Sequence, residues 1–324
     1  MRLSPYIACG VILIMLPPIL PTYLQAIMAK FLVYAIFAMS MDLVMGYTGL
    51  LSLGQAAFFG TGGYVSGILM VHCGVSSFWI NAPFAILITA AIAAVFGFIA
   101  LRLFQVYFML LTFALSQLLL AVAWQWKSIT GGSNGLPGIL RPDLGLPWST
   151  WNSINFYYFV FLLFIICYFI LNRIVNSPFG HVLQGIRENE PRMSAMGYNT
   201  WLYKYICFIV GGVFGGIAGT LFVYYNGFIY PLCFGINYSF LPLMMIIIGG
   251  MGTLFGPVIG CFLITFLEYF ASIYAPERWP LIFGSIFVVV IMFLRKGGIA
   301  FLLVKLWREK GLSYYGKVKG YGPD

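Results

Sequence analysis

Residues 177–198 read SPFGHVLQGIRENEPRMSAMGY, a polar and basic island between two long apolar segments. The island holds Arg187, Glu188, Glu190 and Arg192, and so contains two of the 8 acidic residues in a chain of 324. A chain this poor in charge that concentrates charge in one internal segment presents that segment to water. The island therefore fixes how the apolar segments on either side of it are arranged.

The composition places the rest of the chain in a membrane. Hydrophobic residues make up 62% and charged residues 8%, and the mean hydropathy is +0.97. A soluble domain carries about 25% charged residues. Apolar runs long enough to cross the roughly 30 Å hydrocarbon layer recur along the chain. We therefore predict an all-α fold, a polytopic bundle of transmembrane helices, with residues 1–324 as a single transmembrane domain.

The net charge of +9 does not indicate nucleic-acid binding. Lysine and arginine gather in 173–204 and in the basic tail 295–324, as expected of cytoplasmic segments under the positive-inside rule. The six cysteines are scattered without a C-x-x-C pair, which predicts neither a disulfide framework nor a metal site.

The apolar pattern predicts about ten spans. They are 5–25, 30–46, 57–73, 80–101, 104–123, 154–175, 203–225, 239–250, 253–275 and 280–294. Placing 176–202 and 295–324 in the cytoplasm on their charge puts 124–153 outside and both termini in the cytoplasm. Segment 239–250 is too short to cross, so we expect a half-helix packed inside the protein.

The outer loop contains TGGSNGLPG at 130–138, whose four glycines, asparagine and proline predict tight turns. A compact surface loop and a docking surface for an external partner are equally compatible with this pattern.

Two glycine-rich interruptions lie between apolar segments, at 46–55 and 249–257. Non-helical backbone at membrane depth must be buried in protein or line a wet cavity, and broken helices often mark a transport route. The candidate pathway residues are Gly49, Ser52, Gln55, Gly249, Gly250, Thr253 and Glu268. Close helix packing is the alternative, and we favour it for the glycine run at 211–219.

Charged residues within the predicted spans need partners. For Asp42 the expected partner is Arg102, also on the inner side. Glu268 is expected to meet Arg278 or an aqueous cavity, and Lys30 is expected to extend to the outer interface.

No relay of carboxylates and histidines crosses the predicted bilayer, which counts against proton-coupled transport. No H-E-x-x-H, G-x-S-x-G or P-loop occurs, which counts against a membrane enzyme and against nucleotide hydrolysis by this chain through a P-loop. Energy must then enter from another subunit.

The island itself reads as two short helices. Ser177 suits the N-cap and Pro178 suits the first helical position, so the first helix is expected to run from there to about Asn189. A second helix is expected to cover 191–196, and Gly197 is expected to end it in the left-handed conformation. An apolar stripe follows helical spacing at Phe179, Val182, Leu183 and Ile186. Since acidic side chains are repelled by an anionic leaflet, we favour docking into a protein groove over lying on the membrane.

Four motifs in the same order carry a family resemblance. They are MDLVMGYTGLLSLGQAAFFGTGGY at 41–64, TGGSNGLPGI at 130–139, the island extended to Lys204, and MMIIIGGMGTLFGPVIG at 244–260, with RKGGIA at 295–300 as a weaker fifth. Together they resemble the branched-chain amino-acid ABC permeases of the LivM type.

The resemblance implies a type II ABC importer permease in a bacterial inner membrane. It implies a heterodimer with a second related permease, two cytoplasmic ATPase subunits that hold the ATP and magnesium, and a periplasmic binding protein; this chain binds no cofactor. It also implies a cytoplasmic coupling helix with the coupling residues Phe179, Gly180, His181, Ile186, Arg187, Glu188, Asn189, Glu190, Arg192 and Gly197. His181 departs from the family, where relatives often have arginine.

The expected function is therefore the permease subunit of an ATP-driven importer of leucine, isoleucine or valine, and not an enzyme. The urea or short-chain amide branch of the same permeases is one alternative. An ion-coupled secondary transporter or channel is another.

Overall fold

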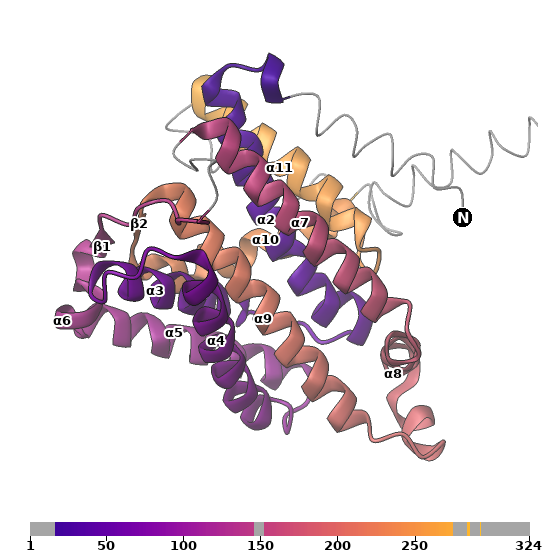
Figure 1. Cartoon of the computed structure of the whole chain (residues 1–324). Coiled ribbons are helices and arrows are strands. Elements are labelled where there is room, and N and C mark those ends of the chain that lie inside the picture. Colours follow the sequence, from indigo (N-terminus) through magenta and orange to yellow (C-terminus); the bar gives the residue numbers. More distant parts are fainter. Residues whose placement is uncertain (1–16, 146–151, 275–283, 286–291, 293–324) are drawn as a thin grey trace, which may run out of the picture.

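The computed structural model describes residues 17–145, 152–274, 284, 285 and 292, and helices dominate it (Figure 1). The α-helices are α2 (Thr22–Thr48), α3 (Gln55–Val71), α4 (Phe78–Ala100), α5 (Gln105–Gln125), α6 (Lys127–Thr130), α7 (Ser153–Val175), α8 (Pro178–Ala195), α9 (Thr200–Asn226), α10 (Ile236–Gly249) and α11 (Phe255–Tyr274). Three short 3-10 helices and two short strands join them: η1 (Pro17–Ile19), η2 (Gly132–Asn134), β1 (Leu136–Pro137), β2 (Phe228–Ile229) and η3 (Pro231–Phe234).

Six of the described helices are long and apolar enough to cross a membrane, namely α2, α4, α5, α7, α9 and α11. They confirm the predicted all-α membrane bundle. The first boundary was wrong, because α2 begins at Thr22 and takes in residues assigned to the span 5–25. The rest of that span up to residue 16, most of 280–294 and the tail 295–324 lie outside the described residues.

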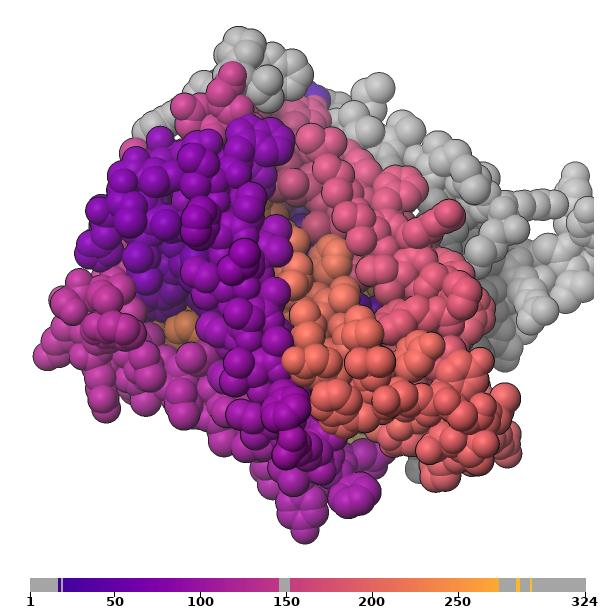
Figure 2. Space-filling model, turned by 60° about the horizontal axis from the view of Figure 1, so that its bottom comes forward, coloured from indigo at the N-terminus to yellow at the C-terminus, as the bar shows by residue number. Residues whose placement is uncertain are grey.

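Helices α2 and α9 form the centre of the bundle. Every residue from 31 to 40 in α2 is buried, and a helix that is apolar on all sides must be surrounded by protein. Helices α7, α9, α10 and α11 pack around α2, while α3 and α4 pack on α9. Figure 2 shows α9 as an orange band between the violet surface of α4 and the pink surface of α7 and α8.

Glycines let α3 and α9 approach until their backbones touch. A Cβ on Gly62 would overlap the carbonyl of Gly216, and a Cβ on Gly219 would overlap the carbonyl of Phe59. Small residues at helix interfaces in membranes serve this close approach. The packing interpretation of the run 211–219 is therefore confirmed.

Helix α10 is the predicted half-helix. It follows η3, which lies inside the bundle: the Ser116 hydroxyl in α5 donates to the Phe234 carbonyl over 2.8 Å, and the Phe234 ring stacks on Tyr64 of α3. From this interior start, the 14 residues of α10 extend about 21 Å, less than the thickness of the hydrocarbon layer.

The loops gather at two opposite ends of the bundle. At one end β1 pairs with β2, His72 lies 3.1 Å from the carbonyl of Ile129, and the Phe78 amide donates to Asp143. The predicted turns at 130–138 are present here, with four glycines at positive φ. Helix α8 and the breaks after α2 and α10 lie at the other end (Figure 1). This arrangement agrees with the predicted alternation of loops, although which end faces the cytoplasm stays a prediction.

Candidate functional site

Helix α8 consists of two short helices with a bend, as predicted. Pro178 follows the N-cap residue Ser177, and Asn189 at φ −159° and ψ 94° interrupts the helical backbone. The Asn189 side chain accepts from the Arg192 amide over 3.0 Å and so caps the second part. Gly197 at φ 91° ends the segment, with the Tyr198 amide donating to the Met193 carbonyl. One detail differs: the Ser177 hydroxyl donates backward to the Ile174 carbonyl instead of capping α8.

The apolar stripe of α8 faces the protein's own bundle. Leu183 and Ile186 are buried, and the Phe179 ring stacks on Tyr203 of α9 at 5.5 Å. Gly180 is buried against the backbone of Val175 in α7. The chain itself therefore covers this stripe, and docking of the segment into a protein groove stays a prediction. The polar side of α8 remains exposed.

The outward side of α8 carries both signs of charge. His181, Glu188, Asn189, Glu190 and Arg192 are all exposed. Glu190 forms an ion pair of 2.5 Å with Lys204 in α9, and the His181 Nδ1 lies 2.9 Å from the Ser177 carbonyl. The Lys204 contact was missed from the sequence, because the predicted cytoplasmic segment ends at residue 202 and Lys204 falls within the predicted span 203–225.

Arg187 is the exception among the charged residues of the island, because its side chain reaches back into the bundle. Its Nη1 donates to the carbonyl of Gly46 near the end of α2. Next to it, the fully buried Asp42 accepts from the Gly252 amide through Oδ1 over 2.8 Å. The predicted partner of Asp42 was therefore wrong: Arg102 instead lies over the Phe98 ring at 4.3 Å.

The candidate pathway residues near the first break are closed off from solvent. Ser52 and Gln55 are fully buried, and Ser52 accepts from the Gly54 amide. Neither polar atom of the Gln55 side chain has a hydrogen-bond partner among the described residues. A Cβ on Gly215 of α9 would lie 3.3 Å from the Gln55 Oε1, so the small residues of α9 make room for this amide.

At the second break, the Thr253 hydroxyl donates to the Gly250 carbonyl over 3.1 Å, and Thr253 itself is exposed. Gly249 is the last residue of α10, and Gly250 follows it at φ 120°. Gly49, which ends α2 at φ 75°, lies against Arg187. The two predicted breaks thus meet near α8.

Glu268 lies far from the breaks and forms an ion pair of 3.1 Å with Lys30 of α2. The pairing of Lys30 with Glu268 was not predicted, the extension of Lys30 to the outer interface stays a prediction, and Arg278 lies outside the described residues. Their common depth could have signalled the pair, because each residue lies about two turns from the end of its helix that is farther from α8. The seven candidate pathway residues therefore occupy two separate places.

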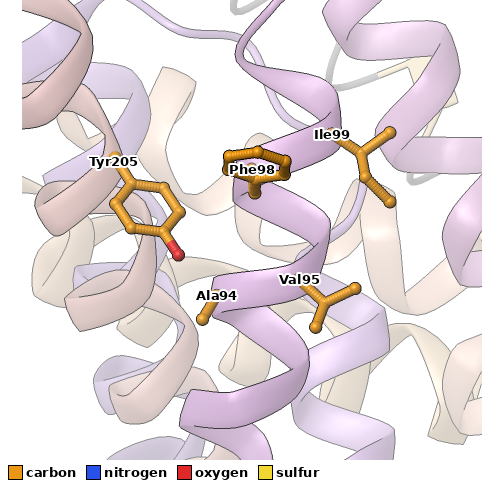
Figure 3. Close-up of a pocket in the computed structure, with 5 residues that line it drawn as sticks. All are labelled: Ala94, Val95, Phe98, Ile99 and Tyr205. Atoms are coloured by element: carbon orange, nitrogen blue, oxygen red, sulfur yellow. The ribbon is translucent and has the colours of Figure 1, made fainter.

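A shallow groove on the outside of the bundle is too apolar for a polar solute. Figure 3 shows its lining, Ala94, Val95, Phe98 and Ile99 of α4 and Tyr205 of α9. The Tyr205 hydroxyl is the one polar side-chain atom there. Among the described residues, no group of three or more His, Cys, Asp or Glu is placed to hold a metal ion.

Comparison with curated proteins finds relatives of one kind. Two are high-affinity branched-chain amino acid transport system permease proteins named LivM, from Salmonella typhimurium and Escherichia coli. Each is 29% identical over 255 residues, which cover 72% of this chain and 60% of the relative. A probable branched-chain amino acid transport permease protein LivM from Methanocaldococcus jannaschii is 25% identical over 324 residues, covering 89% of this chain and 92% of that protein.

The chain thus spans about 60% of the length of the two bacterial relatives. No solved structure matches it. The family described as branched-chain amino acid transport system, permease component, matches residues 23–294, which include α8 and both helix breaks. This chain therefore belongs to the family of permease components of branched-chain amino acid transport systems.

Proposed function

We propose that this chain is a permease subunit of an ATP-driven ABC importer that moves leucine, isoleucine and valine across the bacterial inner membrane by alternating access. Its family and the names of its relatives support this substrate class. Its proposed partners are a second related permease subunit, two cytoplasmic ATPase subunits that bind ATP and magnesium, and a periplasmic binding protein. Residues 1–324 would form one permease domain with both termini in the cytoplasm.

The observation that carries the proposal is the two-sided construction of α8. Its inner side is fastened to the bundle through Leu183 and Ile186, while its outer side offers charges of both signs to water. A helix held in this way can receive a force from a partner and pass it to the spans. The residues proposed to meet the ATPase are the exposed His181, Glu188, Asn189 and Arg192.

The other candidate coupling residues are proposed to position α8. Gly180 and Ile186 are buried, Phe179 packs on α9, Arg187 reaches α2, and Gly197 shapes the end of the segment. Glu190 ties α8 to α9 through Lys204.

The candidate pathway residues fit a closed state of this cycle. Ser52 and Gln55 are buried, so a solute would reach them only after the helices move, as alternating access requires. An unpartnered buried amide is costly and gains a partner when a polar solute or water arrives.

Charge reversal on the exposed face of α8 tests this function. We expect Glu188→Lys to lower co-purification of the ATPase subunits and leucine uptake in proteoliposomes by about tenfold, through lost charge complementarity. Lys127→Glu, on an exposed residue of α6 at the opposite end, is the control for ATPase binding and should leave co-purification unchanged.

Three outcomes would contradict parts of the proposal. Normal co-purification and uptake with Glu188→Lys would refute the docking role. Uptake that continues with a non-hydrolysable ATP analogue would indicate secondary transport instead. Uptake of urea but not of leucine would move the chain to the amide branch.

A further inference from the structure

Three segments that are distant in the chain converge at the α8 end of the bundle. They are the end of α2 around Gly46, the α10–α11 turn around Gly252, and α8 at Arg187. The backbones at Gly46 and Gly252 touch: a Cβ on Gly46 would lie 2.6 Å from the Gly252 amide nitrogen. Gly252 has φ 75°, a left-handed conformation that favours glycine.

Asp42 and Arg187 hold this contact from both sides. The Asp42 carboxylate accepts the Gly252 amide, and the Arg187 guanidinium donates to the Gly46 carbonyl. A Cβ on Gly252 would lie 2.8 Å from the Arg187 Nη1, so a side chain at this position would displace the guanidinium. The charges of Arg187 and Asp42 also attract each other.

Burial differs between the two charged partners. Asp42 is fully buried, and its Oδ2 has no hydrogen-bond partner among the described residues. Arg187 as a whole is exposed, with only its bond to Gly46 partly buried. Water can solvate the exposed arginine when it leaves, but the buried carboxylate then loses its nearby cation, so the cost of opening falls on Asp42. The contact is therefore one that can be made and broken.

We propose that Asp42, Gly46, Arg187 and Gly252 form a clamp that joins α8 to both helix breaks, and that Arg187 is a positioning residue within the permease. A shift of α8 then moves the end of α2 and the α10–α11 turn together, because Arg187 is bonded to one and packed against the other. The inference rests on the proposed function only for the source of the movement, the ATPase. The clamp itself is a property of this chain.

A double-mutant cycle on the full chain tests the clamp. The variants are Arg187→Gln, Asp42→Asn and their combination, with Arg173→Gln as the matched control, an exposed arginine at the end of α7. The first readout is hydrogen exchange of the purified permease without any partner. We expect each single variant to speed exchange at both 185–195 and 250–254. The double variant should add little, because both changes break one unit.

The second readout uses the complex assembled with its ATPase subunits in proteoliposomes. We expect Arg187→Gln and Asp42→Asn to retain the ATPase subunits yet transport about tenfold less leucine per ATP hydrolysed, a typical size for lost coupling between sites. Arg187→Lys, which keeps the charge but not the guanidinium geometry, should give an intermediate loss.

The outcomes separate the clamp from the proposed function. Unchanged exchange at 250–254 in Arg187→Gln, or strictly additive effects of the two substitutions, would overturn the clamp. Loss of the ATPase with Arg187→Gln but not with Asp42→Asn would make Arg187 a partner contact and also overturn it. If the wild-type chain binds no ATPase while the exchange results hold, the clamp stands and the proposed function fails.

Discussion

Charged side chains inside the bundle are few, and each of two acidic ones has a particular neighbour. Glu268 pairs with Lys30 across α11 and α2, and Asp42 receives the Gly252 amide. Charge within the hydrocarbon layer is costly, so such residues face one another or the protein interior. Both side chains of the Lys30–Glu268 pair are partly exposed, which limits how much the pair stabilises the fold.

For this pair we expect Glu268→Gln to lower the midpoint of thermal unfolding in detergent by roughly 2–4 °C, because Lys30 loses its partner. Exchanging the two residues, Lys30→Glu with Glu268→Lys, should recover most of the loss since the pair is restored in reverse. If the exchanged variant lowers the unfolding midpoint by as much as Lys30→Glu and Glu268→Lys lower it when their separate effects are added, the pair contributes nothing to stability.

Partners of this kind could not be read from the sequence. Asp42 and Glu268 stand out as charges in apolar segments, yet their partners lie 210 and 238 residues away along the chain. The helical pattern of α8 predicts that Arg187 lies beside the buried Ile186. The same pattern cannot predict that the guanidinium reaches α2, because this contact depends on how other helices pack.

The bounds of several individual helices agree with those predicted from the local sequence. The predicted span 154–175 corresponds to Ser153–Val175, and the bend in α8 lies at Asn189 where expected. Length alone identified α10 as a half-helix. Helix η3, which places the start of α10 inside the bundle, was not predicted, because its position depends on Ser116 and Tyr64 in other helices.

Glycine substitutions in α9 separate close packing from ordinary helix propensity. We expect Gly219→Ala to destabilise the protein by about 1–3 kcal/mol, because the new methyl group meets the backbone of α3. Gly215→Ala is the milder comparison: its Cβ would meet no backbone atom and would lie 3.3 Å from the Gln55 Oε1, so we expect a smaller loss. Thermal unfolding in detergent measures both, and equal losses would refute the packing argument.

The whole molecule has two unlike ends. One carries β1, β2 and the glycine turns, and the other carries α8 and both helix breaks. The charge pattern predicts that the α8 end faces the cytoplasm. The sequence predicts an orientation at all because lysine and arginine are so unevenly distributed.

Thiol labelling tests the orientation. Cys73 is exposed at the β1–β2 end, while Cys167, Cys207, Cys233 and Cys261 are buried. In a Cys9→Ser background, a membrane-impermeant maleimide should label Cys73 in intact spheroplasts. A cysteine introduced by Gln184→Cys in a variant that also carries Cys73→Ser should react only after permeabilisation. The reverse pattern would invert the topology.

The meeting of α2 and α10 beside Arg187 has an electrostatic consequence. Both helices end there, at Thr48 and Gly249, and a helix C-terminus carries about half an elementary negative charge. The Asp42 carboxyl lies close enough to Arg187 to feel its charge, and the guanidinium is bonded to the end of α2. Withdrawing Arg187 would leave these groups to repel one another. Arg187 would thus hold the segments together in part by offsetting this repulsion, which its departure would expose.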